Sequence, residues 1–158
     1  MRPLLICDCD EVLLHMVRHF GAWLDEAHAI DFDYGTRDYA RAMRRRETGA
    51  YVDLREELET FLSGFFPAEM ERQTLVPHAR EALEELSRVA DVVILTNIGD
   101  HCRDHRIAQL ARYGIEQPVQ CNQGGKGEAV ARLIADRGAP VAVFVDDRNI
   151  AEAELDLK

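Results

Sequence analysis

Lysine is scarce in this 158-residue chain, and positive charge as a whole is in deficit. The sequence has 17 arginines but only two lysines, Lys126 and the terminal Lys158, against 29 aspartates and glutamates. The formal net charge is therefore −10. A chain this acidic is a poor candidate for non-specific nucleic-acid binding, so we expect no nucleic-acid partner.

The chain also lacks long apolar runs and paired cysteine motifs. No apolar stretch approaches the roughly 18 residues that span a membrane, and the run at residues 3–7 is too short for a signal peptide. The four cysteines are Cys7, Cys9, Cys102 and Cys121. They form no C-x-x-C pair, which favours reduced thiols over a disulfide framework. We therefore expect a cytoplasmic protein without a membrane partner.

Three short apolar runs have the pattern of strands that are buried on both faces. They lie at residues 4–7, 91–95 and 141–145, and a weaker fourth run lies at residues 119–121. Segments with apolar residues at helical spacing follow Pro77, Asp100 and Lys126. Alternation of strands and helices predicts an α/β fold with a mainly parallel sheet.

The stretch from residue 14 to residue 76 breaks this alternation. Apolar residues at helical spacing occur twice, at residues 13–27 and 54–65. Asp53 and Glu56 are placed like a capping box before the second of these segments. The predicted domains are a core of residues 1–13 and 77–158 and a helical insertion of residues 14–76.

Small polar or acidic residues follow each of the three main predicted strands. They are Asp8 and Asp10 after the first, Thr96 and Asn97 after the second, and Asp146 and Asp147 after the third. Ligands of open α/β sheets bind outside the carboxyl ends of the strands, so four carboxylates converge if these strands are neighbours. Clustered carboxylates favour a cation, and an oxygen-only set suits Mg²⁺ better than Zn²⁺.

Lys126 adds a positive charge to this predicted site. It is the only internal lysine, and it would open the helix that precedes the last main strand. Both an ammonium group and a helix N-terminus favour an anion. A cation site, a hydroxyl group and a lysine together indicate a phosphoryl-transfer pocket.

These residues, in this order, resemble the motifs of the haloacid dehalogenase superfamily. Asp8-Cys9-Asp10-Glu11-Val12 is similar to its first motif, Leu95-Thr96-Asn97 to its second, Lys126 to its third and Phe144-Val145-Asp146-Asp147 to its fourth. The resemblance spans residues 4–149. It implies a three-layer, Rossmann-like α/β/α core, and residues 14–76 resemble the cap that many members carry after the first motif.

The resemblance implies a Mg²⁺-dependent phosphatase that acts on a small phosphorylated metabolite through an aspartyl-phosphate. Asp8 would be the nucleophile, and Asp10 the general acid and then the general base. Thr96 and the Asn97 backbone would hold the phosphoryl group, and Lys126 would neutralise it and orient Asp8. The implied metal ligands are Asp8, the backbone carbonyl of Asp10, Asp146 and Asp147.

Two features depart from the family pattern. Glu11 stands where most members have glycine. The sequence ends 11 residues after Asp147, where members usually continue through a further helix and strand, so a sheet without its usual edge strand is one expectation. Asp10 argues against a dehalogenase proper, because those enzymes lack this aspartate and need no metal.

Several alternatives stay open at this point. The same residues fit a phosphomutase, which would pass the phosphoryl group to a second substrate oxygen, or a non-catalytic relative that binds phosphoryl ligands. His101, Cys102 and His105 are an alternative zinc site without an evident fourth ligand. Arg44–Arg46 is an alternative phosphate contact. The natural substrate and the oligomeric state are not indicated.

Two other phosphate-related readings are disfavoured. A receiver-type phosphoacceptor domain places its acidic pair after the first strand, whereas Asp146 and Asp147 follow the last. The segment around Lys126 is not a P-loop, because Gln120 occupies the position of the first glycine and no Ser or Thr follows the lysine.

Overall fold

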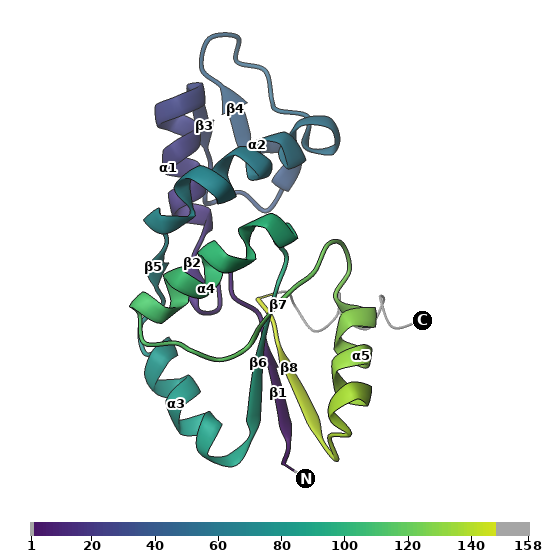
Figure 1. Ribbon diagram of the computed structural model, residues 1–158. Coiled ribbons are helices and arrows are strands. Elements are labelled where there is room, and N and C mark those ends of the chain that lie inside the picture. The colour runs from purple at the N-terminus through teal and green to yellow at the C-terminus, as the bar shows by residue number, and fades with distance from the viewer. Residues whose placement is uncertain (1, 148–158) are drawn as a thin grey trace. The chain divides into compact units, whose positions relative to one another are not determined.

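The computed structural model describes residues 2–147, which fold as two compact units (Figure 1). Of the described residues, unit 1 contains 2–14 and 75–147, and unit 2 contains 15–74. The chain passes between them at β2 (Leu14–His15) and β5 (Thr74–Leu75), which pair in a two-stranded sheet. Unit 2 begins one residue after the predicted insertion begins and ends two residues before it ends.

Four strands form the central sheet of unit 1, in the order β7-β6-β1-β8. They are β1 (Leu4–Cys7), β6 (Asp91–Thr96), β7 (Val119–Cys121) and β8 (Ala142–Val145). All neighbours are parallel, which confirms the predicted α/β fold with a mainly parallel sheet. Cys7 is in register with Ile94 and with Val145, so β1, β6 and β8 direct their carboxyl ends to one edge.

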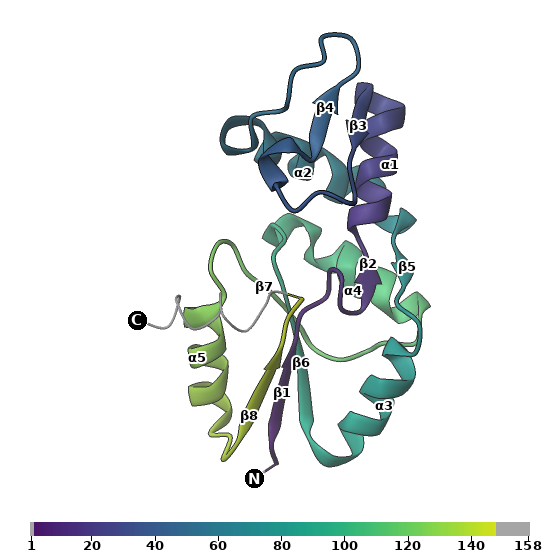
Figure 2. The ribbon, with the colours of Figure 1, turned by 180° about the vertical axis from the view of Figure 1, so that it is seen from behind.

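Helices cover both faces of this sheet (Figures 1 and 2). They are α3 (Ala79–Val89) and α4 (Arg103–Arg112) on one face and α5 (Gly127–Arg137) on the other, with a short 3₁₀ helix, η3 (Asp100–Cys102), before α4. Leu5 and Ile94 pack toward Leu83 and Leu110, whereas Leu4, Ile6 and Leu95 pack toward α5. The three layers explain why β1 and β6 are continuous apolar runs.

The outer strand β8 is less buried than the sequence predicts. Val143 and Val145 are 53% and 39% exposed, while Phe144 packs on the α5 side. The prediction that residues 141–145 are buried on both faces is therefore wrong for the described structure. β8 is the edge of the described sheet, and residues 2–147 leave these two valines partly exposed. The expectation of a sheet without its usual edge strand concerns residues 148–158, which lie outside the described residues.

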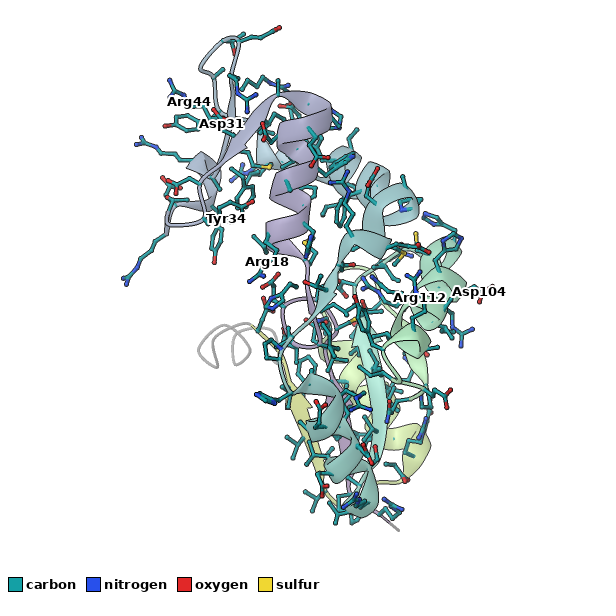
Figure 3. All side chains as sticks on the ribbon, turned by 90° about the vertical axis from the view of Figure 1, so that its left-hand side faces the viewer. Arg18, Asp31, Tyr34, Arg44, Asp104 and Arg112 are labelled. Atoms are coloured by element: carbon teal, nitrogen blue, oxygen red, sulfur yellow. The ribbon has the colours of Figure 1, made fainter. Side chains whose placement is uncertain are left out.

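Unit 2 combines two helices with a small antiparallel sheet. Its elements are α1 (Val17–His28), β3 (Ile30–Phe32), η1 (Tyr39–Arg41), β4 (Met43–Arg45), α2 (Leu54–Glu69) and η2 (Met70–Arg72). The predicted helical insertion contains the helices α1 and α2, and it also contains the pair of β3 and β4, which the sequence pattern does not predict. Ile30 and Met43 are buried, whereas Asp31 and Arg44 face each other on the exposed side (Figure 3). Strands of three residues are too short for this alternation to stand out in the sequence.

An aromatic cluster forms the core of unit 2. The ring of Phe65 contacts the rings of Phe20, Trp23 and Phe66, with centroids 5.4 to 5.7 Å apart. Tyr34 lies against the start of α1, where its hydroxyl donates to the carbonyl of Arg18 at 3.2 Å (Figure 3). The buried rings of the cluster come from α1 and α2, so unit 2 has an apolar centre of its own.

The N-terminus of α2 is capped, but not by the predicted pair. The Asp53 carboxylate accepts from the Arg55 N–H at 2.9 Å, and the Asp53 N–H donates to Glu57 at 3.2 Å. Glu57 therefore takes the place that the sequence assigns to Glu56, one residue further into the helix.

None of the helices in residues 2–147 combines the length and apolar character that crossing a bilayer needs. All four cysteines are buried free thiols.

Phe65→Ala should lower the free energy of unfolding by about 3–5 kcal/mol, because it removes a fully buried ring and leaves a cavity. Urea denaturation followed by circular dichroism measures this loss. Tyr39→Ala is the control, since that ring is 77% exposed and its loss should cost less than about 0.5 kcal/mol. Equal losses in the two variants would contradict the assignment of Phe65 to the core.

Candidate active site

Four of the predicted site residues meet at the carboxyl edge of the sheet in unit 1. Asp8 follows β1, Asp146 and Asp147 follow β8, and Lys126 is the residue just before α5. The Lys126 Nζ lies 2.6 Å from Asp8 Oδ2 and 3.8 Å from Asp146 Oδ2. One carboxylate oxygen from each of the three aspartates lies within 4.8 Å of the others. We call the three aspartates Asp8, Asp146 and Asp147 the acidic cluster, and Lys126 is its lysine.

The backbone around Asp8 fixes its carboxylate. The Asp8 N–H donates to the Val145 carbonyl at 2.8 Å, which continues the pairing of β1 with β8. The Cys9 N–H donates to Asp8 Oδ1 at 2.7 Å, while Lys126 holds Oδ2. Asp8 and Lys126 are both almost fully buried. The orientation of this carboxylate is therefore set by two partners, one on each oxygen.

Burial and like charge raise two pKa values in the cluster. Burial raises the pKa of Asp8 to about 7, although Lys126 and the Cys9 N–H act in the opposite direction. Burial, together with Asp146, raises the pKa of Asp147 to about 6. A divalent cation among these carboxylates would favour their charged forms. The donor set contains only oxygen atoms, so it fits a hard cation such as Mg²⁺.

Thr96 and Asn97, at the end of β6, complete the edge. The Thr96 side chain is fully buried, and its Oγ1 has no hydrogen-bond partner among the residues that the structure describes. An unsatisfied buried hydroxyl costs free energy, which a ligand oxygen could recover. The Asn97 side chain is exposed, and its amide donates to the Gly124 carbonyl at 2.9 Å.

The carboxylate of Asp10 does not join the acidic cluster. Both of its oxygens accept from Nη2 of Arg106, at 3.0 and 3.1 Å. Arg106 is completely buried on α4, and its Nη1 donates to Gln109 Oε1 at 3.0 Å. The assignment of the Asp10 backbone carbonyl as a metal ligand, like the other catalytic roles, stays a prediction.

Two solved structures are similar to this chain. One is a haloacid dehalogenase-like family hydrolase from Streptococcus pneumoniae, with a TM-score of 0.64 and 12% identity over 92% of this chain and 76% of that chain. The other is a haloacid dehalogenase-like family hydrolase from Xanthomonas campestris, with a TM-score of 0.53 and 15% identity over 93% and 75% of the two chains. The chain has the haloacid dehalogenase-like fold. No protein-family model and no curated protein matches its sequence.

Within the haloacid dehalogenase-like fold, Glu11 takes a backbone conformation that suits glycine. Its φ is +61°, in the left-handed region that costs most residues about 1–2 kcal/mol. Its N–H donates to the Leu14 carbonyl at 2.7 Å, which closes the turn after the first motif. Glu11 therefore has the left-handed φ that glycine adopts without this cost.

Sequence reasoning missed two residues of this edge, Arg106 and Asn122. Arg106 lies four residues from both Cys102 and Leu110, and all three are buried. The sequence signal for Arg106 is therefore a charged residue in line with apolar residues on one helix face. Asn122 follows β7 directly, and the rule that polar residues at strand ends are functional applies to it as well.

The alternative zinc site is not assembled. His101 and His105 are exposed and Cys102 is buried. Within residues 2–147 the acidic cluster is the one group of potential metal ligands whose atoms come together. Burial also raises the pKa of the Cys7 and Cys9 thiols, so neither is a reactive thiolate.

The alternative phosphate contact in unit 2 has protein partners instead. Arg44 donates to the Gly49 carbonyl at 3.0 Å, Arg45 pairs with Glu57, and Arg46 pairs with Asp25 and Asp31. All three arginines therefore have partners within unit 2, and a phosphate contact at this segment stays a prediction.

Arg106→Met should lower the free energy of unfolding by about 3–5 kcal/mol, because it leaves the mostly buried Asp10 carboxylate without its cation. Urea denaturation measures the loss, and adding Asp10→Asn to the variant should recover part of it. Arg103→Met is the matched control on the exposed side of α4, with an expected loss below about 1 kcal/mol. A loss below about 1 kcal/mol for Arg106→Met would contradict the importance of the pair.

Proposed function

We propose that this protein is a Mg²⁺-dependent phosphohydrolase of the haloacid dehalogenase superfamily that acts on a small phosphorylated metabolite. The observation that supports this most directly is the buried contact of 2.6 Å between Lys126 and Asp8, beside the carboxylates of Asp146 and Asp147. The fold agrees with this proposal, and so does the order of the four sequence motifs.

A carboxylate is a weak nucleophile and needs an oriented, neutralised phosphoryl group to attack. In the proposed first step, an Asp8 oxygen attacks phosphorus while the bond from phosphorus to the leaving oxygen breaks. Asp10, in the protonated form that this role requires, would give its proton to that oxygen, whereas in the structure both of its oxygens accept from Arg106. In the second step, water attacks the aspartyl-phosphate and passes a proton to Asp10, and the bond to Asp8 breaks to release phosphate. The enzyme returns to its starting state.

The remaining residues hold charge and geometry. The Thr96 hydroxyl and the Asn97 backbone N–H would donate to the phosphoryl oxygens, and Lys126 would neutralise them while it holds Asp8. The residues that would hold Mg²⁺ are Asp8, the backbone carbonyl of Asp10, Asp146 and Asp147. When bound, Mg²⁺ supplies positive charge that stabilises the phosphoryl oxygens.

Asp8→Asn should lower kcat for para-nitrophenyl phosphate by about 10³-fold or more, because the amide cannot form the phosphoenzyme. Steady-state hydrolysis with Mg²⁺, and again with EDTA, measures the effect. Asp136→Asn is the control, since Asp136 is an exposed carboxylate on α5. Full Mg²⁺-dependent activity in Asp8→Asn would overturn the proposal. Transfer of the phosphoryl group to a second substrate would indicate a mutase.

Asp147→Asn should raise the melting temperature of the metal-free protein above pH 6 and abolish its response to Mg²⁺. The pKa of Asp147 is raised on folding, so its contribution to stability is present at low pH and is lost as the pH rises from about 4 to about 6. Because asparagine carries no charge, the Asp147→Asn protein does not lose this stability above pH 6.

Thermal denaturation at pH 7.5 measures both effects. For the unmodified protein, Mg²⁺ at ten times its Kd should add about 1.4 kcal/mol, or roughly 3–6 °C. Equal Mg²⁺ responses of the two proteins would contradict the assignment of Asp147 as a ligand. The same titration with Asp136→Asn should reproduce the response of the unmodified protein.

A further inference from the structure

The loop that carries Lys126 has little packing of its own. It runs from Asn122 to Gly125, between β7 and α5, and contains two consecutive glycines. Gly124 has a φ of +88°, and beyond the adjacent chain no described atom lies within 4 Å of the position that a Cβ would take at Gly124 or Gly125. Glycine leaves the backbone maximally free, so contacts elsewhere must set the path of this loop.

The side chain of Asn122 supplies those contacts. Its Nδ2 lies 2.9 Å from Asn97 Oδ1, 3.1 Å from the Gly124 carbonyl and 3.3 Å from the Gly125 carbonyl. The backbone N–H of Asn122 donates to the Thr96 carbonyl at 2.9 Å. One amide group therefore folds the glycine turn back on itself and ties it to the end of β6.

Asn97 completes the arrangement from the other side. Its Nδ2 donates to the same Gly124 carbonyl at 2.9 Å while its Oδ1 accepts from Asn122. Two side-chain amides thus join the second motif to the loop before the third. The Asn97 backbone N–H, which the proposed mechanism assigns to the phosphoryl group, is not used in these side-chain bonds.

We propose that Asn122 is a positioning residue that holds Lys126 against Asp8. The effect of Asn122 on the reaction rate rests on the proposed function. Its effect on the position of Lys126 rests on the geometry alone. Lys126 is two residues after Gly124 and directly precedes α5. A shift of the glycine turn therefore moves the start of α5, and with it the Lys126 Nζ that lies 2.6 Å from Asp8. A displacement of about 1 Å at a reacting group can cost about 10²-fold in rate.

The first test uses the chemistry of the only internal lysine. Lys126 is 4% exposed, so acylation by an amine-reactive ester, followed by peptide mass spectrometry, reports how firmly its amine is held in the site. Asn122→Ala and the uncharged, similarly sized Asn122→Leu should raise the acylation rate of Lys126 several-fold. Gln120→Ala is the matched control, because Gln120 is exposed on β7 and, among residues 2–147, its side chain donates only to the Cys121 carbonyl.

The second test is a double-mutant cycle on para-nitrophenyl phosphate hydrolysis. Asn122→Ala should lower kcat by roughly 10- to 100-fold with less than about threefold change in KM. If Asn122 acts through Lys126, Asn122→Ala should have almost no further effect in a Lys126→Ala background. A purely structural role would instead lower activity by the same factor in both backgrounds.

The outcomes separate this inference from the proposed function. An unchanged acylation rate in both Asn122 variants, or additive effects in the cycle, would overturn the role of Asn122 and leave the phosphatase proposal intact. An unmodified protein without Asp8-dependent hydrolysis would overturn the phosphatase proposal, and the acylation rates would still decide whether Asn122 holds Lys126. Melting temperatures of both variants show whether they fold.

Discussion

The buried ion pair between Lys126 and Asp8 is the interaction on which the rest of the site depends. Removing two opposite charges from water costs several kcal/mol for each ion unless geometry and further hydrogen bonds compensate. The Cys9 N–H meets the second oxygen of Asp8, and the amide of Asn122 holds the loop that carries Lys126. The acidic cluster around the pair has an excess of negative charge that this single lysine does not balance. A divalent cation would balance it, and this is the physical reason for the proposed magnesium dependence.

Much of unit 1 could be predicted because its elements are local and its topology follows simple rules. β1 and β6 are largely continuous apolar runs, and β7 has the predicted bounds although its central residue, Gln120, is exposed. Parallel strands direct their carboxyl ends to one edge, so the meeting of Asp8 with Asp146 follows once the strands are neighbours. The prediction that β8 is buried on both faces is wrong, because the burial of an outer strand depends on the segments that pack against it.

The parts that could not be predicted depend on partners that are distant in the sequence. The buried Arg106 pairs with the carboxylate of Asp10, which lies 96 residues earlier in the sequence. The Asn122 side chain donates to Asn97, which follows another strand of the sheet. In unit 2 the pairing of β3 with β4 involves three residues on each side, and helical propensity nearby conceals it. Each case needs tertiary contacts that no pattern along one segment contains.

The distribution of cysteine and tryptophan gives each unit a separate natural reporter. All four thiols belong to unit 1 and are buried, whereas the single indole, Trp23, belongs to the aromatic core of unit 2. Thiol-labelling kinetics therefore follow the opening of unit 1, and indole fluorescence follows the loss of packing in unit 2, without an added label or a substitution. The chain passes between the units twice, through β2 and β5. Comparing the two signals in one denaturation experiment measures how cooperatively an inserted unit unfolds with the unit that contains it.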